Sequence, residues 1–391
     1  MIPNIILAKG QHRVECGHAW VYRNEISEIR GNPQDGDIVD AVNQSGKFIA
    51  RGYYNGQALI SFRALARKPL EISENFWRNR LEQACARRKL RYPDLAACRL
   101  VHSEADFLPG LIVDKYADAL VIQTNTLGME SRKQIFVRLL SEMLKPSAIL
   151  EHNDSSSREL EKLPRLNGVL SGNCDGSMKV KIGCAMFSFN LFEQHKTGSY
   201  LDQQQNYRIV ADFVAPGTRV LDGFCNMGGF AIHALLSGAR EAVAVDSNAK
   251  TIACAKTSAE LNGVGARLHC RTENMFDYLR AAQKAGERFD FIILDPPSFS
   301  RSHKAVAEAR RGYKEIHLRA FKLLNPGGLL ATFCCSHHVS QSMFMQFILE
   351  AARDARAVLR RETVMGAAPD HPVLPALPET EYLKGFVFSI C

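Results

Sequence analysis

Two short segments of the chain with strand character end in aspartate, and a glycine-rich loop follows the first of them. Residues 218–221 lead into Asp222 and the loop Gly223–Gly229, and residues 242–245 lead into Asp246. If these segments are neighbouring parallel strands, their carboxyl ends border a crevice in which a nucleotide can lie, and the second acid can hold ribose hydroxyls. The sequence therefore predicts a cofactor that contains a nucleoside.

The loop also discriminates between cofactors of this kind. A dinucleotide site has the spacing Gly-x-Gly-x-x-Gly, which turns backbone amides toward a pyrophosphate, and this loop lacks that spacing. Asp222 would moreover place a carboxylate near the diphosphate. S-adenosylmethionine has no phosphate and carries a sulfonium and an amino group, which a carboxylate attracts. We therefore expect S-adenosylmethionine as the cofactor.

Two further segments carry groups that could take part in the reaction itself. The apolar segment 289–294 ends in Asp295-Pro296-Pro297, and the segment after the turn at 325–328 ends in Cys334-Cys335. The consecutive prolines stiffen the loop and fix the direction of Asp295. A thiolate that adds to C6 of cytosine makes C5 nucleophilic enough to attack a sulfonium methyl, whereas methylation of an exocyclic amine needs no cysteine. The combination favours methylation at C5.

The two adjacent thiols cannot both enter one pocket, because consecutive residues of a strand face opposite sides. The other interpretation of either cysteine is a buried apolar thiol, which is the commonest environment of this residue. His337 and His338 follow directly, and we expect them at the surface or facing RNA.

The elements that must position these residues form the last of three parts. Beyond about residue 186, strands and helices alternate, which is typical of a doubly wound, Rossmann-like α/β sheet. Residues 1–68 contain short strands separated by turns, a pattern that favours a small β domain. Residues 69–185 mix helix and strand signals. We expect three domains with the boundaries 1–68, 69–185 and 186–391.

Composition excludes several classes of protein. Of the 391 residues, 46% are hydrophobic and 23% are charged, which excludes wholesale disorder. No apolar run reaches the ~18 residues of a membrane-spanning helix. The eleven cysteines form no Cys-x-x-Cys pair, so we expect reduced thiols in a cytoplasmic protein and no metal site.

Charge points to a polyanionic partner. The formal net charge is +8, and nine basic residues against three acidic ones lie between Arg63 and Arg91. This segment has a helical pattern with basic residues on its polar faces. It is either a solvated helix face or a phosphate-contacting surface, and the sequence leaves both interpretations open.

Taken together, these motifs resemble class I S-adenosylmethionine-dependent methyltransferases. Longer stretches are similar to the ribosomal RNA large subunit methyltransferase I family, which makes 5-methylcytosine in 23S ribosomal RNA. The stretches that carry this resemblance, over nearly the whole chain, are Glu104–Asp114, Thr197–Gln203, Arg311–Glu315, Cys335–His338, and His371-Pro372 with Tyr382–Gly385. The resemblance implies an N-terminal RNA-binding PUA domain, a central α/β domain that helps to build the RNA cleft, and a C-terminal methyltransferase domain.

The resemblance also implies roles for single residues and for partners. It makes Cys335 the nucleophile and Asp295 the group that contacts N3 and N4 of cytosine, and it implies no metal. The implied partner is 23S ribosomal RNA or a precursor of the large ribosomal subunit, without a membrane, and a homodimer stays open. The implied cofactor-binding residues are Thr197, Tyr200, Gln203, Asp222, Gly223, Phe224, Cys225, Gly228, Gly229, Asp246, Asn274, Asp295 and Pro296.

Two other functions remain open at this stage. One is an RNA methyltransferase that acts on uridine C5 or on a guanine amine. The other is an RNA-binding protein whose methyltransferase domain has degenerated. Binding of S-adenosylmethionine would distinguish the second from the first, and the base present in the RNA would distinguish among the methyltransferases.

Overall fold

The computed structural model describes residues 2–91, 96–193, 197–299 and 306–391. The chain divides into two units, and each is described by itself. Unit 1 consists of Met1–Met178, Asn190–Leu201 and Pro369–Thr380, and unit 2 consists of Lys179–Phe189, Asp202–Ala368 and Glu381–Cys391.

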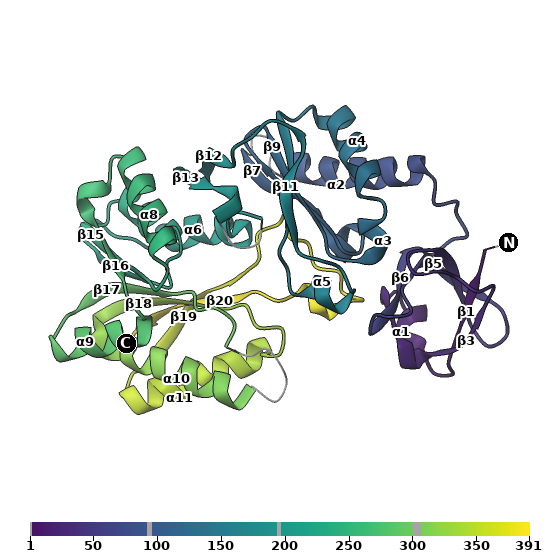
Figure 1. The fold of residues 1–391 in the computed structure, drawn as a ribbon. Helices are drawn as coiled ribbons and strands as arrows, with labels where there is room; N and C mark the ends of the chain where they lie inside the picture. The colour runs from purple at the N-terminus through teal and green to yellow at the C-terminus, as the bar shows by residue number, and fades with distance from the viewer. Residues whose placement is uncertain (1, 92–95, 194–196, 300–305) are drawn as a thin grey trace. The chain divides into compact units, whose positions relative to one another are not determined.

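A six-stranded sheet with the order β2-β6-β5-β4-β1-β3 forms the N-terminal part of unit 1 (Figure 1). The short strands expected in this part are therefore present. Ile5, Val39 and Phe62 are fully buried in its core. Its elements are β1 Asn4–Leu7, α1 His12–Glu15, β2 Trp20–Tyr22, the 3-10 helix Arg23–Glu25, β3 Ile26–Arg30, β4 Ile38–Val42, β5 Phe48–Tyr54 and β6 Ile60–Ala66.

A five-stranded sheet with the order β11-β10-β9-β8-β7 follows in unit 1. Trp77 of α2 and Phe136 of α4 meet edge to face, 5.5 Å between ring centroids, in the core of this part. Its elements are α2 Glu74–Arg91, β7 Ala97–His102, the 3-10 helix Ser103–Asp106, β8 Leu111–Tyr116, β9 Ala119–Thr124, α3 Leu127–Glu130, α4 Lys133–Leu144, β10 Ala148–Asn153, α5 Ser157–Leu160 and β11 Leu166–Gly172.

The basic segment between Arg63 and Arg91 is partly internal to unit 1. Arg63 pairs with Glu104 and Glu161, and Arg88 is buried in an ion pair with Asp106. These cations stabilise the fold, so they are not available to phosphates. The basic residues of the segment that lie exposed are Arg67, Lys68, Arg87, Lys89 and Arg91.

A seven-stranded sheet with the order β16-β15-β14-β17-β18-β20-β19 is the centre of unit 2. Its strands are parallel except β20, which runs antiparallel to both of its neighbours. The strands are β14 Arg219–Gly223, β15 Glu241–Asp246, β16 Leu268–Thr272, β17 Phe289–Leu294, β18 Leu324–Cys334, β19 Leu359–Gly366 and β20 Lys384–Ile390; the hairpin β12 Ser177–Ile182 and β13 Ala185–Asn190 precedes them.

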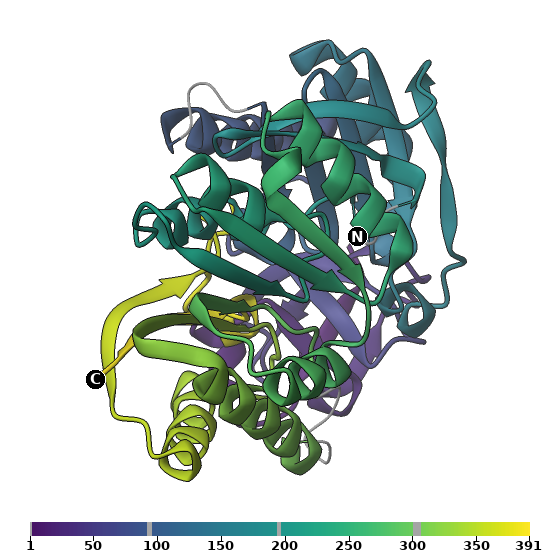
Figure 2. The same ribbon diagram turned by 90° about the vertical axis from the view of Figure 1, so that its left-hand side faces the viewer.

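Helices cover both faces of this sheet, as Figures 1 and 2 show. Parallel strands that are covered on both faces read as nearly continuous apolar runs, which is why 289–294 was recognisable in the sequence. Side-chain caps on Asn248, Asn274 and Ser340 start three of the helices. One face carries α6 Gln204–Ala211, α7 Gly229–Leu236 and α8 Ala249–Leu261, and the other carries α9 Met275–Lys284, α10 Val306–Leu323 and α11 Gln341–Ala355.

Short 3-10 helices complete the described elements of both units. They lie at Leu191–Glu193, Leu201–Gln203, Gly265–Arg267 and Pro378–Thr380.

The strand order has its switch point at β14, which pairs with β15 on one side and with β17 on the other. The chain leaves β14 toward α7 on one face and leaves β17 toward α10 on the opposite face. Ligands of open α/β sheets bind outside the carboxyl ends of the strands at such a point. Asp222, Asp246 and Asp295 all lie at or directly after these strand ends.

None of the described helices is long and apolar enough to span a membrane.

Candidate active site

The glycine-rich loop after β14 is a tight turn with an unusual backbone. Phe224, Asn226 and Gly228 have φ values of 61°, 48° and 74°, in the left-handed region. The amide of Cys225 donates to the carbonyl of Val245 on β15 at 3.1 Å, and the amide of Gly228 donates back to Cys225 at 2.8 Å. The loop is thereby held against the second acid-ended strand, as the sequence predicts.

Gly229 begins α7 and is required by packing. A Cβ at this position would lie 2.5 Å from the ring of Tyr207 on α6, which is too close for any side chain. The absence of a side chain therefore lets α6 and α7 approach each other. A direct role of Gly229 in cofactor binding stays a prediction.

Asp222 is fully buried at the end of β14. Its Oδ2 accepts a hydrogen bond from the amide of Ala231 at 2.9 Å, whereas its Oδ1 is buried without a hydrogen-bond partner among the described residues. Burial raises the pKa of Asp222 to about 8; the hydrogen bond from Ala231 lowers it, and the charges of Asp295 and Asp246 raise it further. An unpartnered buried carboxylate oxygen fits a site for a cationic or hydrogen-bond-donating ligand group.

Asp246 lies half-buried at the end of β15, and backbone amides hold its carboxylate. Its Oδ2 accepts from the amide of Asn226, and its Oδ1 accepts from the amide of Asn248, both at 2.9 Å. Each carboxylate oxygen has further acceptor capacity. Asp246 is therefore fixed in place and still able to accept hydrogen bonds from ribose hydroxyls.

Asn274 is exposed and forms the N-cap of α9, where its side chain accepts from the amide of Phe276 at 2.9 Å. The cap is by itself a sufficient reason for an asparagine here. Contact with adenine stays a prediction for this residue.

Asp295 is oriented by a chain of buried amides. Gln203 donates to Asp295 Oδ2 at 2.9 Å, and Asn206 donates to Gln203 Oε1 at 2.6 Å and to the carbonyl of Gly366 at 2.8 Å. The backbone amide of Asp295 donates to the carbonyl of Gly223 at 3.3 Å. Gln203, predicted as a cofactor residue, thus contacts the predicted catalytic carboxyl. Sequence reasoning missed Asn206, whose only signal is its position one helical turn after Gln203.

The two cysteines at the end of β18 have different neighbours, as strand alternation requires. Cys334 is fully buried, and its sulfur accepts a hydrogen bond from the hydroxyl of Tyr313 on α10 at 3.2 Å. Cys335 is half-buried, and its Sγ lies 3.9 Å from the carbonyl oxygen of Pro296. The loops after β17 and β18 therefore meet, and they bring Cys335 next to the Asp295-Pro296 segment.

Thr197 and Tyr200, the other two predicted cofactor residues, belong to unit 1. Thr197 is fully buried, and its hydroxyl donates to Asp114, which is in turn paired with Arg99 at 2.8 Å. Tyr200 is half-buried. Their roles in cofactor binding stay predictions.

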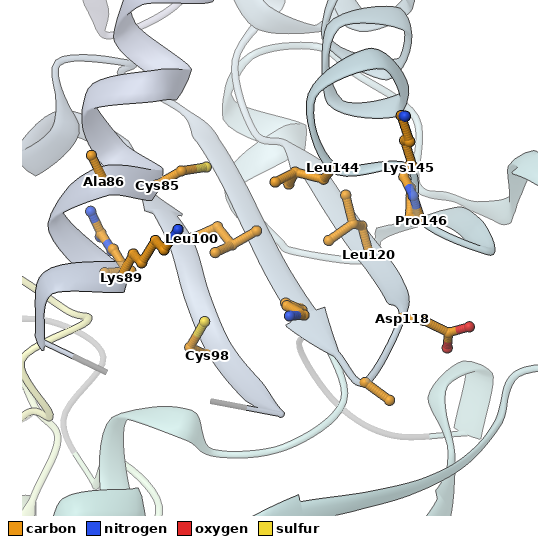
Figure 3. A pocket seen from close by; sticks show the side chains of 13 residues that line it. Cys85, Ala86, Lys89, Cys98, Leu100, Asp118, Leu120, Leu144, Lys145 and Pro146 are labelled. Atoms are coloured by element: carbon orange, nitrogen blue, oxygen red, sulfur yellow. The ribbon is translucent and has the colours of Figure 1, made fainter. Parts of the chain in front are cut away.

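A cavity of about 490 Å³ lies elsewhere in unit 1, between the ends of α2 and α4 and the strands β7–β9 (Figure 3). Cys98, Leu100 and Leu120 contribute an apolar wall, and Lys89 and Lys145 lie at its edge. None of the predicted cofactor or catalytic residues lines it. The described residues contain no cluster of three or more His, Cys, Asp or Glu side chains suited to hold a metal ion.

Comparison with known proteins gives consistent matches over the whole chain. The family model of a PUA-like domain matches residues 5–67, and that of an S-adenosylmethionine-dependent methyltransferase matches residues 167–388. The chain is 36% identical to ribosomal RNA large subunit methyltransferase I of Aeromonas hydrophila, over 99% of both chains. It is 37% identical to the protein of the same name from Tolumonas auensis, over 95% of this chain and 94% of that one.

Solved structures agree on the fold. A Streptococcus mutans protein described as an S-adenosylmethionine-dependent methyltransferase covers 100% of both chains with a TM-score of 0.85 at 18% identity. A methyltransferase in complex with S-adenosylhomocysteine has the same TM-score and coverage at 19% identity. The fold class predicted from the sequence is confirmed.

Proposed function

This chain belongs to the ribosomal RNA large subunit methyltransferase I family, and from that premise we propose that it forms 5-methylcytosine in 23S ribosomal RNA through a covalent bond between Cys335 and C6 of the base. Its cofactor is S-adenosylmethionine, which supplies an electrophilic methyl group on a sulfonium. The cytoplasmic location and the homodimer stay predictions.

The observation that carries the proposal is the approach of Cys335 to the Asp295-Pro296 segment, with 3.9 Å between the sulfur and the carbonyl of Pro296. Cys335 is half-buried, whereas Cys334 is fully buried and its sulfur accepts a hydrogen bond from Tyr313. A thiol and a carboxyl on adjacent loops suit a reaction that needs a nucleophile at C6 and a hydrogen-bonding group at N3.

In this mechanism the electron pair of the Cys335 thiolate forms the bond to C6, and the C5=C6 pair of the ring moves to C5 and attacks the methyl carbon. The bond between the methyl group and the sulfonium sulfur breaks, its electron pair stays on that sulfur, and S-adenosylhomocysteine is the leaving group. After methyl transfer, a base takes the proton from C5. The electrons of the C5–H bond then restore the C5=C6 double bond, and the thiolate leaves C6.

Asp295 gives selectivity for cytosine in this proposal. A carboxyl group in its protonated form donates to N3 of cytosine and accepts from the 4-amino group, whereas uridine, where N3 is a donor and O4 an acceptor, requires the two carboxyl oxygens to exchange these roles. The hydrogen bond from Gln203 to Oδ2 fixes the plane of this carboxyl group. Protonation or hydrogen bonding at N3 also makes C6 more electrophilic.

Methyl transfer from labelled cofactor to ribosomal RNA, with identification of the product nucleoside, tests the proposal. We expect 5-methylcytosine from the native chain and from Cys334→Ala, and none from Cys335→Ala, with cofactor binding retained in all three. Methylated uridine or guanine as the product would contradict the assignment of the base. Activity in Cys335→Ala, or its loss in Cys334→Ala alone, would contradict the assignment of the nucleophile.

A further inference from the structure

Lys384 is a buried lysine whose ammonium group lies at the turn that carries Cys335. It is the first residue of β20 and is paired with Cys334, the last residue of β18. The residue is 8% exposed. The Nζ donates to the carbonyl of Ser336 at 2.7 Å and to the carbonyl of Val339 at 2.8 Å.

These two hydrogen bonds organise the segment between β18 and α11. The amide of Val339 also donates to the carbonyl of Ser336 at 3.4 Å, and Ser340 then caps α11. Lys384 thus closes the turn at two points, directly after the predicted nucleophile. Its ammonium has a third N–H in addition to the two bonds that the structure gives it.

The charge of Lys384 acts on the two thiols. Burial lowers the pKa of Lys384, and the charges of Cys334, Cys335 and Glu381 raise it. An ammonium that attracts a thiolate stabilises that thiolate equally, because the interaction is mutual. Cys334 is fully buried, whereas Cys335 is half-buried. Stabilisation of a thiolate therefore bears on a reaction with a substrate at Cys335 and not at Cys334.

Among the described residues, four other titratable groups lie near this turn, namely Tyr313, Asp295, His337 and His338. Tyr313 on α10 has its pKa raised, first by burial and then by the charges of Cys334, Cys335 and Asp295, so it is neutral. Asp295, on the loop after β17, is a carboxyl group and carries no positive charge in either protonation state. His337 is exposed with its ring centroid 5.6 Å from that of Tyr382, and His338 is half-buried in the same turn.

We propose that Lys384 is a positioning residue that holds the Cys335 turn and whose positive charge stabilises the Cys335 thiolate before it adds to the pyrimidine. The proposal rests on the function proposed above. When the thiol ionises, its proton leaves to solvent and the negative charge on sulfur is compensated by the ammonium. When the thiolate adds to C6, its electron pair forms the S–C bond and the compensation is no longer needed.

The test measures the reactivity of Cys335 without RNA and without methyl transfer. Iodoacetamide alkylation of Cys335 is followed by peptide mass spectrometry over a range of pH in the full-length protein. In Lys384→Met, which keeps an unbranched side chain one atom shorter and removes the charge, we expect the midpoint of the profile to rise by about one pH unit, or roughly tenfold slower alkylation at pH 7. Lys384→Arg keeps the charge and is expected to restore most of the native rate.

Two further variants separate charge from structure. Lys384→Gln retains a hydrogen-bond donor for the turn but no charge, so it should resemble Lys384→Met if the charge matters. Lys322→Met removes an exposed lysine of α10 and should leave the profile unchanged. Binding of S-adenosylhomocysteine and the melting temperature report whether each variant folds; if Lys384→Met does not fold, the comparison of Lys384→Gln with Lys384→Arg decides.

An unchanged alkylation profile in a folded Lys384→Met or Lys384→Gln protein would overturn the inference, even if methyl transfer fell. Failure of the proposed function has a different signature, namely full methyl transfer by Cys335→Ala. A lower kcat with unchanged KM for RNA in Lys384→Gln, together with the shifted alkylation profile, would support the inference.

Discussion

The substitution Asp222→Asn tests the electrostatics of the cofactor site. Because burial raises the pKa of Asp222 to about 8, the group is about nine-tenths protonated at pH 7 in the free protein. The buried Oδ1 has no hydrogen-bond partner among the described residues, and a cationic group of the cofactor would favour the ionised form. We therefore expect cofactor binding to release a proton from this carboxyl group.

The size of the effect follows from linkage. If the carboxylate is ionised in the complex, affinity should rise about tenfold per pH unit below pH 8 and level off above it. A charge-assisted hydrogen bond contributes about 1.5–3 kcal/mol, so Asp222→Asn should bind roughly ten- to hundredfold more weakly above pH 8. Its affinity should also lose most of the dependence on pH.

Isothermal titration calorimetry with S-adenosylhomocysteine measures the released proton directly. At pH 7, in two buffers of different ionisation enthalpy, the native protein should release about 0.9 proton on binding, since that fraction of Asp222 is protonated beforehand. Asp222→Asn controls for protons that come from the ligand and should release close to none. Equal proton release by both proteins would refute the reasoning.

Asp222→Asn, which should weaken cofactor binding, should raise the thermal stability of the free protein. The folded pKa of Asp222 lies above its ordinary value of 3.8, so the unfolded chain ionises first and the folded state loses stability as the pH rises from 3.8 to about 8. At pH 7 this cost is about 4 kcal/mol at most. Asp222→Asn is therefore expected to melt at a higher temperature than the native protein at pH 7, with a smaller difference near pH 4.

Three further predictions concern other residues of unit 2. Burial lowers the pKa of His317 from 6.5 to about 4. The free energy of unfolding measured with urea should therefore fall by about 3 kcal/mol in total as the pH drops from 6.5 to 4. His317→Phe should lose most of this dependence on pH. Gln203→Leu removes the hydrogen bond to Asp295 and should lower kcat about tenfold; an unchanged kcat would show that the bond does not orient the carboxyl. Gly229→Ala places a Cβ against the ring of Tyr207 and should reduce the free energy of unfolding by about 1–3 kcal/mol in calorimetry.

Local patterns were sufficient to predict the edge of the sheet where the site lies. The strands that lead to Asp222, Asp246 and Asp295 can be recognised from their residue types. Because these strands are parallel, their carboxyl ends lie at the same edge of the sheet. Cys334 is the last residue of β18 and Cys335 follows it directly, and their different environments agree with the alternation predicted for adjacent residues.

Contacts between distant segments could not be predicted in this way. The bond from Gln203 to Asp295 joins residues 92 positions apart, and no local pattern indicates it. Lys384 reaches the Cys335 turn only because β20 is inserted antiparallel between β18 and β19, although it follows both in the chain. Arg63 and Arg88 likewise pair with Glu104 and Asp106. The number of charged residues in a segment does not indicate such pairs.

The covalent bond to the base is the central claim, and an RNA fragment that carries 5-fluorocytosine at the methylated position tests it most directly. Fluorine at C5 cannot leave as a proton does, so the thiolate cannot be expelled after methyl transfer and the adduct should persist. Digestion and mass spectrometry of the complex are predicted to find the methylated base bonded to the peptide that contains Cys335, and to find no adduct with Cys335→Ser. A bond to another residue, or efficient methyl transfer without any adduct, would contradict the account.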